Sequence, residues 1–173
     1  MVPGSSFNDV IYDDLKNSLV NEADTALGMA RADGYGSSLE QYEWGSNGLL
    51  ADNGILLSMA YDITGNTEYR AAAYEQLNYL FRRNSLDLCF VTGFGAVSPQ
   101  YPHSRTGLAH HAYLTGALVG GPDSFREDKV TQRLKYDLPP AKVYIDSPDA
   151  YSVNEIAIYW NSSLIHLLAA LER

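Results

Sequence analysis

The chain has 173 residues, of which 46% are hydrophobic and 19% charged, a composition typical of one globular domain and not of a disordered chain. Its formal net charge of −9 would repel phosphate backbones and anionic lipid surfaces, so no nucleic acid and no membrane is expected as a partner. The single cysteine, Cys89, excludes an internal disulfide.

The N-terminal residues MVPGSSFNDV contain neither a charged n-region nor an apolar h-region. A signal peptide is therefore not expected in this chain. The first predicted helix covers residues 8–31, where apolar residues from Val10 to Leu27 fall mostly three or four apart. It ends at the glycines of RADGYG.

Two further helices are predicted before the middle of the chain. One covers residues 46–63 after the loop sequence YEWGSN, whose Ser46 or Asn47 could cap it. The next covers residues 68–83 and is expected to be capped by Thr67. Its last turn would then carry two arginines, at 82 and 83, where cations match the helix dipole.

Residues 84–145 are rich in glycine, proline and tyrosine and are predicted to be mostly loop. A loop of that length within a compact domain is most often functional. A fourth helix is predicted from Ser147 to the C-terminus, with Pro148 in its first turn. Long helices with broad apolar faces predict an all-α fold of antiparallel helical hairpins. Four such helices would leave apolar flanks, which further helices or a partner should cover.

Glu155 is predicted to lie near the start of this fourth helix, among Val153, Ile156 and Ile158. Burial among apolar side chains disfavours a charged carboxylate and would keep Glu155 protonated, as a general acid requires. If Glu155 is exposed instead, it only compensates the dipole of the helix. The sequence leaves both interpretations open.

Three further side chains are candidates for binding sugar. His103 and Arg105 would share one face of an extended segment and could together bind several hydroxyl groups, or they belong to a surface loop that meets only solvent. Trp44, beside Gly45, is either a core aromatic residue or a stacking platform for a sugar ring. The pair His110 and His111 lacks nearby carboxylates, so a metal site is not expected there.

Two motifs follow one another in the second half of the chain. The first is VTGFGAVSPQYPHSR, which ends in Pro-His-x-Arg at residues 102–105. The second is YIDSPDAYSVNEIAIYWNS, in which Asp146, Tyr151, Glu155 and Asn161 stand at fixed spacing. Together they resemble the two signature regions of glycoside hydrolase family 9, mostly cellulases that act on β-1,4-glucans. The segments YEWGSN and ALVGGPD are also similar to that family, so the resemblance covers nearly the whole chain.

The resemblance assigns roles to the candidate residues. Glu155 would be the general acid of an inverting glycosidase, and His103 a catalytic residue that holds sugar hydroxyls together with Arg105. Asp146 would order the site around Glu155. The substrate, a β-glucan or cello-oligosaccharide, would be bound in part by two aromatic side chains, Trp44 and Tyr151.

The resemblance also implies an (α/α)6 barrel larger than this chain, of which residues 1–173 would form the C-terminal portion of the catalytic domain. The family's water-activating aspartate comes from an Asp-Ala-Gly-Asp type stretch before an aromatic helix, and this chain has none. The isolated chain is therefore expected to be weak or inactive as an enzyme. A missing N-terminal half, or a homo-oligomer, would complete the fold.

Two alternatives remain open at this level. The chain is a non-catalytic carbohydrate-binding or assembly fragment, or another polypeptide supplies the N-terminal half and the two reassemble. No cofactor is expected in this chain. The resemblance allows calcium in the parent enzyme, although these residues do not place its sites, and implies that the parent enzyme is secreted.

Overall fold

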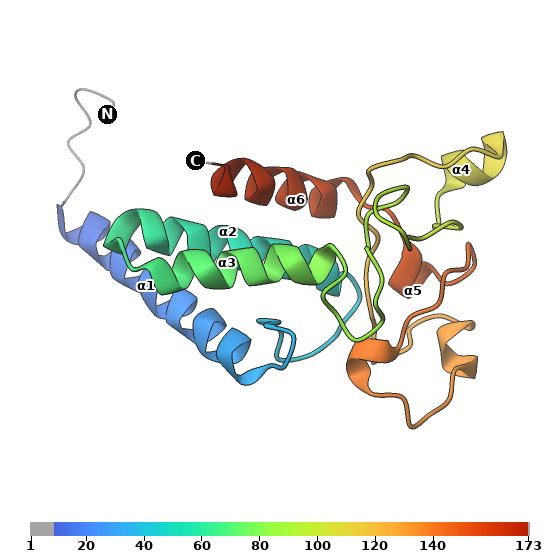
Figure 1. Ribbon diagram of the computed structural model, residues 1–173, viewed down its shortest axis with the longest axis horizontal. Helices are drawn as coiled ribbons and strands as arrows, with labels where there is room; N and C mark the ends of the chain where they lie inside the picture. The colour runs from blue at the N-terminus through green and yellow to red at the C-terminus, as the bar shows by residue number, and fades with distance from the viewer. Residues whose placement is uncertain (1–8, 173) are drawn as a thin grey trace.

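The computed structural model describes residues 9–172 and consists of a helical half and an irregular half (Figure 1). The helical half contains α1 (Asp9–Ala32), α2 (Ser46–Thr64), α3 (Thr67–Leu80) and α6 (Ile158–Leu171). Helix α2 contacts each of the other three and forms an antiparallel hairpin with α3. The predicted all-α class, a part of an (α/α)6 barrel, is confirmed. Within the described residues, no helix is long and apolar enough to cross a bilayer.

Helix α1 enters the core only with its C-terminal half. Ala23, Ala26 and Leu27 are buried, whereas Val10 and Leu15 are more than 60% exposed. The apolar spacing thus predicts the helix correctly but not its burial along the whole length. The predicted start at Asn8 lies outside the described residues.

The ends of α3 differ from the prediction. The N-cap is Asn66, whose side-chain oxygen accepts the N–H of Glu68 (3.1 Å), and Thr67 is the first helical residue. The helix ends at Leu80, so Arg82 and Arg83 do not form its last turn. Arg82 has a positive φ of 116°, and the amide of the buried Asn84 donates to the carbonyls of Tyr79 and Leu88, which closes the turn that follows.

A buried amide holds the loop that leads to α2. The side-chain oxygen of Gln76 accepts the N–H and the hydroxyl of Ser38 (both 2.9 Å), and its nitrogen donates to the carbonyl of Gly36 (2.8 Å). Gln76 is fully buried in α3. The path of the loop towards Trp44 is therefore fixed from within the core.

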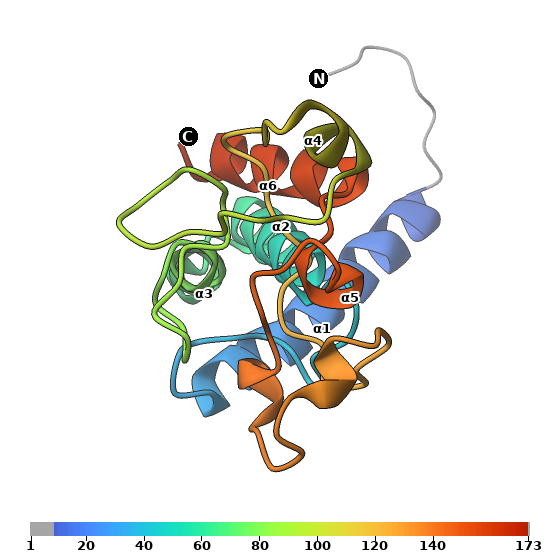
Figure 2. The ribbon, with the colours of Figure 1, turned by 90° about the vertical axis from the view of Figure 1, so that its right-hand side faces the viewer.

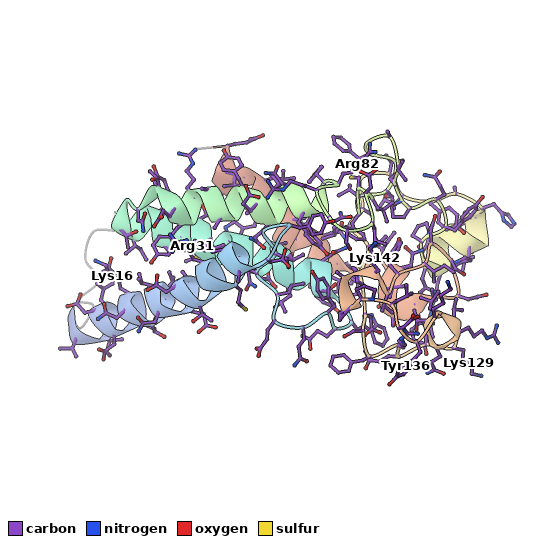
Figure 3. All side chains as sticks on the ribbon, turned by 60° about the horizontal axis from the view of Figure 1, so that its bottom comes forward. Lys16, Arg31, Arg82, Lys129, Tyr136 and Lys142 are labelled. Atoms are coloured by element: carbon purple, nitrogen blue, oxygen red, sulfur yellow. The ribbon has the colours of Figure 1, made fainter. Side chains whose placement is uncertain are left out.

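The irregular half contains α4 (Arg105–His110), the 3-10 turns η1 (Thr131–Arg133) and η2 (Pro140–Lys142), and the single-turn helix α5 (Tyr151–Asn154). Figure 2 shows α5 near the centre of this end of the molecule, with loops around it. Lys129 and Tyr136 lie on its outer surface, away from α1 (Figure 3). Isolated β-bridges, and not strands, connect the loops within the described part of the chain.

The predicted fourth helix is interrupted. Residues 147–150 precede the helical turns, and α5 and α6 are separated by residues 155–157. Glu155 (φ −68°, ψ 147°) and Ala157 (φ −117°, ψ 143°) are extended. The helix is interrupted because the backbone C=O groups of residues 154 and 155 and the N–H group of residue 156 form hydrogen bonds with His103 and Gly120 and not with neighbours in a helix. Pro148 therefore lies in a loop and not in a helical turn.

Candidate active site

Glu155 lies in a small backbone ladder. The N–H of His103 donates to the carbonyl of Asn154 (2.8 Å), and the N–H of Ile156 donates to the carbonyl of His103 (3.3 Å). From the other side, the N–H of Gly120 donates to the carbonyl of Glu155 (2.9 Å). Because Glu155 and His103 are paired in a parallel bridge, their side chains leave the backbone on the same face.

The predicted surroundings of Glu155 are wrong in two respects. Glu155 follows the C-terminal end of α5 and is not in the first turns of a helix, so the expected compensation of a helix dipole does not apply. Its apolar enclosure is also incomplete, because Val153 is buried but Ile158 is 90% exposed. The extended backbone turns Ile158 outward and leaves the Glu155 side chain half-buried at the wall of a cleft.

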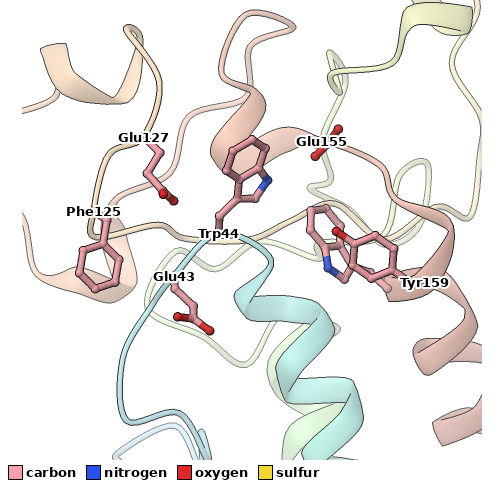
Figure 4. Close-up of a pocket in the computed structure, with 7 residues that line it drawn as sticks. Glu43, Trp44, Phe125, Glu127, Glu155 and Tyr159 are labelled. Atoms are coloured by element: carbon pink, nitrogen blue, oxygen red, sulfur yellow. The ribbon is translucent and has the colours of Figure 1, made fainter.

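This cleft has a volume of about 650 Å³ and is mostly lined by carboxylates and aromatic rings. Figure 4 shows the carboxylate of Glu155 between the rings of Trp44 and Tyr159. Trp44 is 40% exposed, so it is not a core aromatic residue. Carboxylates supply acceptors and aromatic rings supply flat apolar faces, which together suit a sugar. The lining residues are Glu43, Trp44, Phe125, Glu127, Glu155, Tyr159 and Trp160.

The imidazole of His103 is fixed in one orientation. Its Nδ1 lies 2.6 Å from the carbonyl oxygen of Pro148. A carbonyl oxygen can only accept, so Nδ1 carries the proton and donates it to Pro148. The other nitrogen, Nε2, is therefore able to accept a hydrogen bond from a hydroxyl group.

Tyr151 connects His103 with Trp44. The centre of its ring is 5.4 Å from that of Trp44 and 6.0 Å from that of His103. Its hydroxyl donates to the carbonyl of Glu127 (3.2 Å). The three aromatic side chains therefore form a continuous row from the cleft to the backbone ladder, and Tyr151 does not stand alone as a binding group.

Asp146 uses both carboxylate oxygens within the protein. One oxygen accepts the N–H of Gln100 (2.7 Å), and the other accepts the N–H of Tyr101 (3.0 Å) and the side-chain amide of Asn154 (3.0 Å). Asp146 thus joins the segment before His103 to the residue before Glu155. Arg105 begins α4 and is exposed, and within residues 9–172 its guanidinium forms no hydrogen bond or ion pair.

The first turn of α2 differs from the expected cap. The N-cap is Gly45, without a side-chain bond, whereas Ser46 donates its hydroxyl to the carbonyl of Pro122 (2.8 Å) and Asn47 donates its amide to that of Val119 (2.9 Å). These side chains hold residues 119–122 against α2. They position the cleft wall and do not cap the helix.

Trp160 is a wall residue that the sequence did not indicate. Its ring lies against three glycines from two segments: a Cβ built at Gly45, Gly48 or Gly120 would come within 2.7, 2.2 or 3.3 Å of it. The close approach expected at Gly45 is thus occupied by Trp160 of the protein itself. The spacing of Gly45 and Gly48 at the start of α2 is the signal that could have pointed to a large packed side chain.

Two buried carboxylates shape the loop that supplies Phe125 and Glu127. Asp123 accepts the N–H groups of both residues (2.9 and 3.1 Å). Asp128 accepts the N–H groups of Val130, Thr131 and Ser152 (2.8, 2.7 and 3.0 Å). Burial alone would raise the pKa of Asp128, but these hydrogen bonds outweigh it and lower the pKa below its ordinary value. The ionised Asp128 therefore ties this loop to the first turn of α5.

Within the described residues, no group of three or more His, Cys, Asp or Glu side chains could hold a metal ion. His110 ends α4 and His111, its C-cap, has a positive φ of 51°. Both histidines are exposed.

Comparison with known proteins places this chain in a family. The family model "Glycosyl hydrolase family 9" matches residues 8–168. A cellulose 1,4-beta-cellobiosidase of Acetivibrio thermocellus is 35% identical over 170 residues, which cover 91% of this chain and 19% of that protein. A cellodextrinase of Butyrivibrio fibrisolvens is 37% identical over 161 residues, 90% of this chain and 29% of that protein.

A solved structure has the same fold. The structure of AaCel9A in complex with cellobiose-like isofagomine is 31% identical and has a TM-score of 0.89, over 99% of this chain and 34% of that one. The chain belongs to glycosyl hydrolase family 9. It spans about a third or less of the length of these relatives.

Proposed function

We propose that this chain provides the acid-bearing part of an active site that hydrolyses β-1,4-glucosidic bonds in cellulose-type glucans. Glu155 donates the proton to the glycosidic oxygen, and Trp44 stacks against a sugar ring. His103 and Arg105 hold sugar hydroxyls, and Asp146 orders the segments that carry Glu155 and His103. The observation that carries the proposal is the backbone pairing of His103 with Glu155, whose side chain lines the aromatic cleft.

The geometry supports these roles. A general acid must reach the leaving oxygen, and the Glu155 side chain is accessible from the cleft. With Nδ1 bound to Pro148, Nε2 of His103 offers a single, fixed group for a sugar hydroxyl. The names of the relatives, a cellobiosidase and a cellodextrinase, support a cello-oligosaccharide as the ligand, as does the cellobiose-like compound bound by AaCel9A.

The reaction needs a second carboxylate, and we assign that role to no residue of this chain. In an inverting glycosidase a base activates water on the far face of the sugar, roughly 6.5–9.5 Å from the acid. We assign that base to the Asp-Ala-Gly-Asp type stretch of a larger catalytic domain, in which this chain is the C-terminal portion. The domain is proposed to be secreted, like an enzyme that acts on an extracellular polymer.

Glu155→Gln tests the proposed acid in a catalytic domain that contains this chain. Hydrolysis of cello-oligosaccharides should fall by about 10²–10⁴-fold, because a general acid contributes that much. Hydrolysis of aryl or fluoride glycosides should fall far less, because their leaving groups scarcely need a proton. His103→Ala is the matched comparison and should weaken both reactions, since it acts on the sugar. Equal losses on both substrates with Glu155→Gln would contradict the assignment.

A second function is favoured by one observation, the row of rings formed by Trp44, Tyr151 and His103, which can bind a sugar without catalysing its hydrolysis. The chain would then bind cello-oligosaccharides through Trp44 and His103 without turnover. Binding measured by calorimetry, together with the absence of hydrolysis in every assembly that contains the chain, would support this function over the first.

A further inference from the structure

Asn154, the residue before Glu155, is fully buried and uses both ends of its carboxamide. Its nitrogen donates to the carbonyl of Tyr101 (2.8 Å) and to the carboxylate of Asp146 (3.0 Å). Its oxygen accepts the hydroxyl of Tyr144 (2.5 Å). The orientation of the amide follows from these partners, because a carbonyl and a carboxylate only accept and the tyrosine supplies the remaining hydrogen.

These bonds join three separate segments of the irregular half. Asp146 also accepts the N–H groups of Gln100 and Tyr101, so one carboxamide and one carboxylate connect residues 100–103, 144–148 and 154–155. The middle segment, through Pro148, also orients the ring of His103. The positions of both Glu155 and His103 therefore depend on the same network.

No helix holds Glu155 in place. It follows the single turn of α5, and its backbone is extended. Asn154 is bound to the segment of His103 twice: its backbone carbonyl accepts the N–H of His103, and its side chain donates to Tyr101. A displacement of Asn154 would therefore change the distance between the Glu155 carboxylate and the imidazole.

We infer that Asn154 is the positioning residue that sets the geometry between Glu155 and His103, and that the hydroxyl of Tyr144 supports it. Asn154 does not line the cleft, so it acts through Glu155 and not on a sugar. The inference rests on the proposed function, in which Glu155 donates the proton. Loss of one buried partner leaves the others unsatisfied, which makes the network sensitive to a single substitution.

Hydrogen exchange on the full 173-residue chain tests the structural half of this inference. Asn154→Asp replaces the donor nitrogen by an oxygen without changing the volume, and Tyr144→Phe removes only the supporting hydroxyl. The amides of His103 and Ile156, which bridge the two segments, should exchange about tenfold or more faster in Asn154→Asp, while those of α2 keep their rates. Tyr144→Phe should have the same effect to a smaller extent.

Tyr79→Phe is the matched control. Tyr79 is also buried, and its hydroxyl is 3.3 Å from that of Tyr42, outside the network. It should leave the exchange of His103 and Ile156 unchanged. If neither Asn154→Asp nor Tyr144→Phe accelerates these two amides, the inference is wrong. Should Asn154→Asp fail to fold, Tyr144→Phe decides the question.

Kinetics in a catalytic domain that contains the chain test the functional half. Asn154→Asp should lower kcat for cello-oligosaccharides by about 100-fold, the effect of a misplaced catalytic group, with KM unchanged. The loss should be smaller for aryl glycosides, although less so than for Glu155→Gln, because a displaced His103 weakens both reactions. Equal losses on both substrates would indicate a merely structural role and overturn the inference. If the unmodified domain hydrolyses neither substrate, the proposed function fails, and the exchange rates alone decide the role of Asn154.

Discussion

Substitution of Gly48 by alanine tests how tightly the wall of the cleft is packed. A Cβ at this position of α2 would lie 2.2 Å from Cδ1 of Trp160. The indole has little room to withdraw, because it is only 6% exposed and also lies against Gly45. Overpacking of this kind costs about 1–3 kcal/mol, and the confinement of the ring favours the upper end.

The expected loss follows from two opposed effects. Alanine is better than glycine in a helix by up to about 1 kcal/mol, which leaves a net destabilisation of about 2 kcal/mol. For a chain of this size that lowers Tm by about 4–8 °C. Thermal unfolding followed by circular dichroism measures the change.

Gly28→Ala is the matched control. Gly28 lies in α1, and a Cβ built there meets no atom within 4 Å. The same substitution should raise Tm by about 2–4 °C through helix propensity alone. If Gly48→Ala is as stable as the unmodified chain while Gly28→Ala behaves as expected, the indole of Trp160 does not pack tightly against α2.

Three further predictions concern acid stability, association and thiol reactivity. Because its pKa is lowered in the folded state, Asp128 contributes stability above the ordinary carboxyl pKa of about 4, and this is lost as the pH falls through the lowered value. Asp128→Asn should therefore flatten the acid limb of an unfolding titration, whereas Asn at the exposed Asp87 should change it little. The exposed apolar side chains of α1 and α6, such as Leu15 and Ile165, predict self-association or a bound partner, and a clean monomer at high concentration in sedimentation without dye-detectable apolar surface would contradict this. Burial raises the pKa of the Cys89 thiol, so alkylation should be slow in the native chain and fast in urea, and rapid native labelling would show that this part of the core opens.

The long helices were predictable because their apolar spacing and glycine stops are local signals. The bounds of α2 and the start of α3 agree with the sequence prediction within one residue. The end of α3 differs from the prediction. The helix ends at Leu80, and Arg82 belongs to a turn in which the side chain of Asn84 donates to the carbonyl of Leu88. Such a turn depends on a side chain beyond the helix, which helix propensity does not report.

The conformation of Glu155 could not be predicted for a similar reason. Local sequence favours a continuous helix through 155, but the partners that hold this segment extended come from His103 and Gly120, far away in the chain. The resemblance to the two signature regions of the family identified Glu155, His103 and Asp146 as candidates without giving their geometry. Tyr159 and Trp160 were missed as wall residues because their place in the cleft depends on how α6 packs against the glycines of α2.

We propose, as the central claim, that Glu155 is the acid of a glycosidase site whose water-activating base lies in another part of the catalytic domain. The most direct measurement is hydrolysis of a soluble β-1,4-glucan by the purified 173-residue chain, beside its Glu155→Gln variant and beside a catalytic domain that contains the chain. We expect little or no hydrolysis by the chain alone, and hydrolysis by the domain that depends on Glu155. Cleavage by the chain alone at rates typical of enzymes, unchanged by Glu155→Gln, would contradict both parts of the claim.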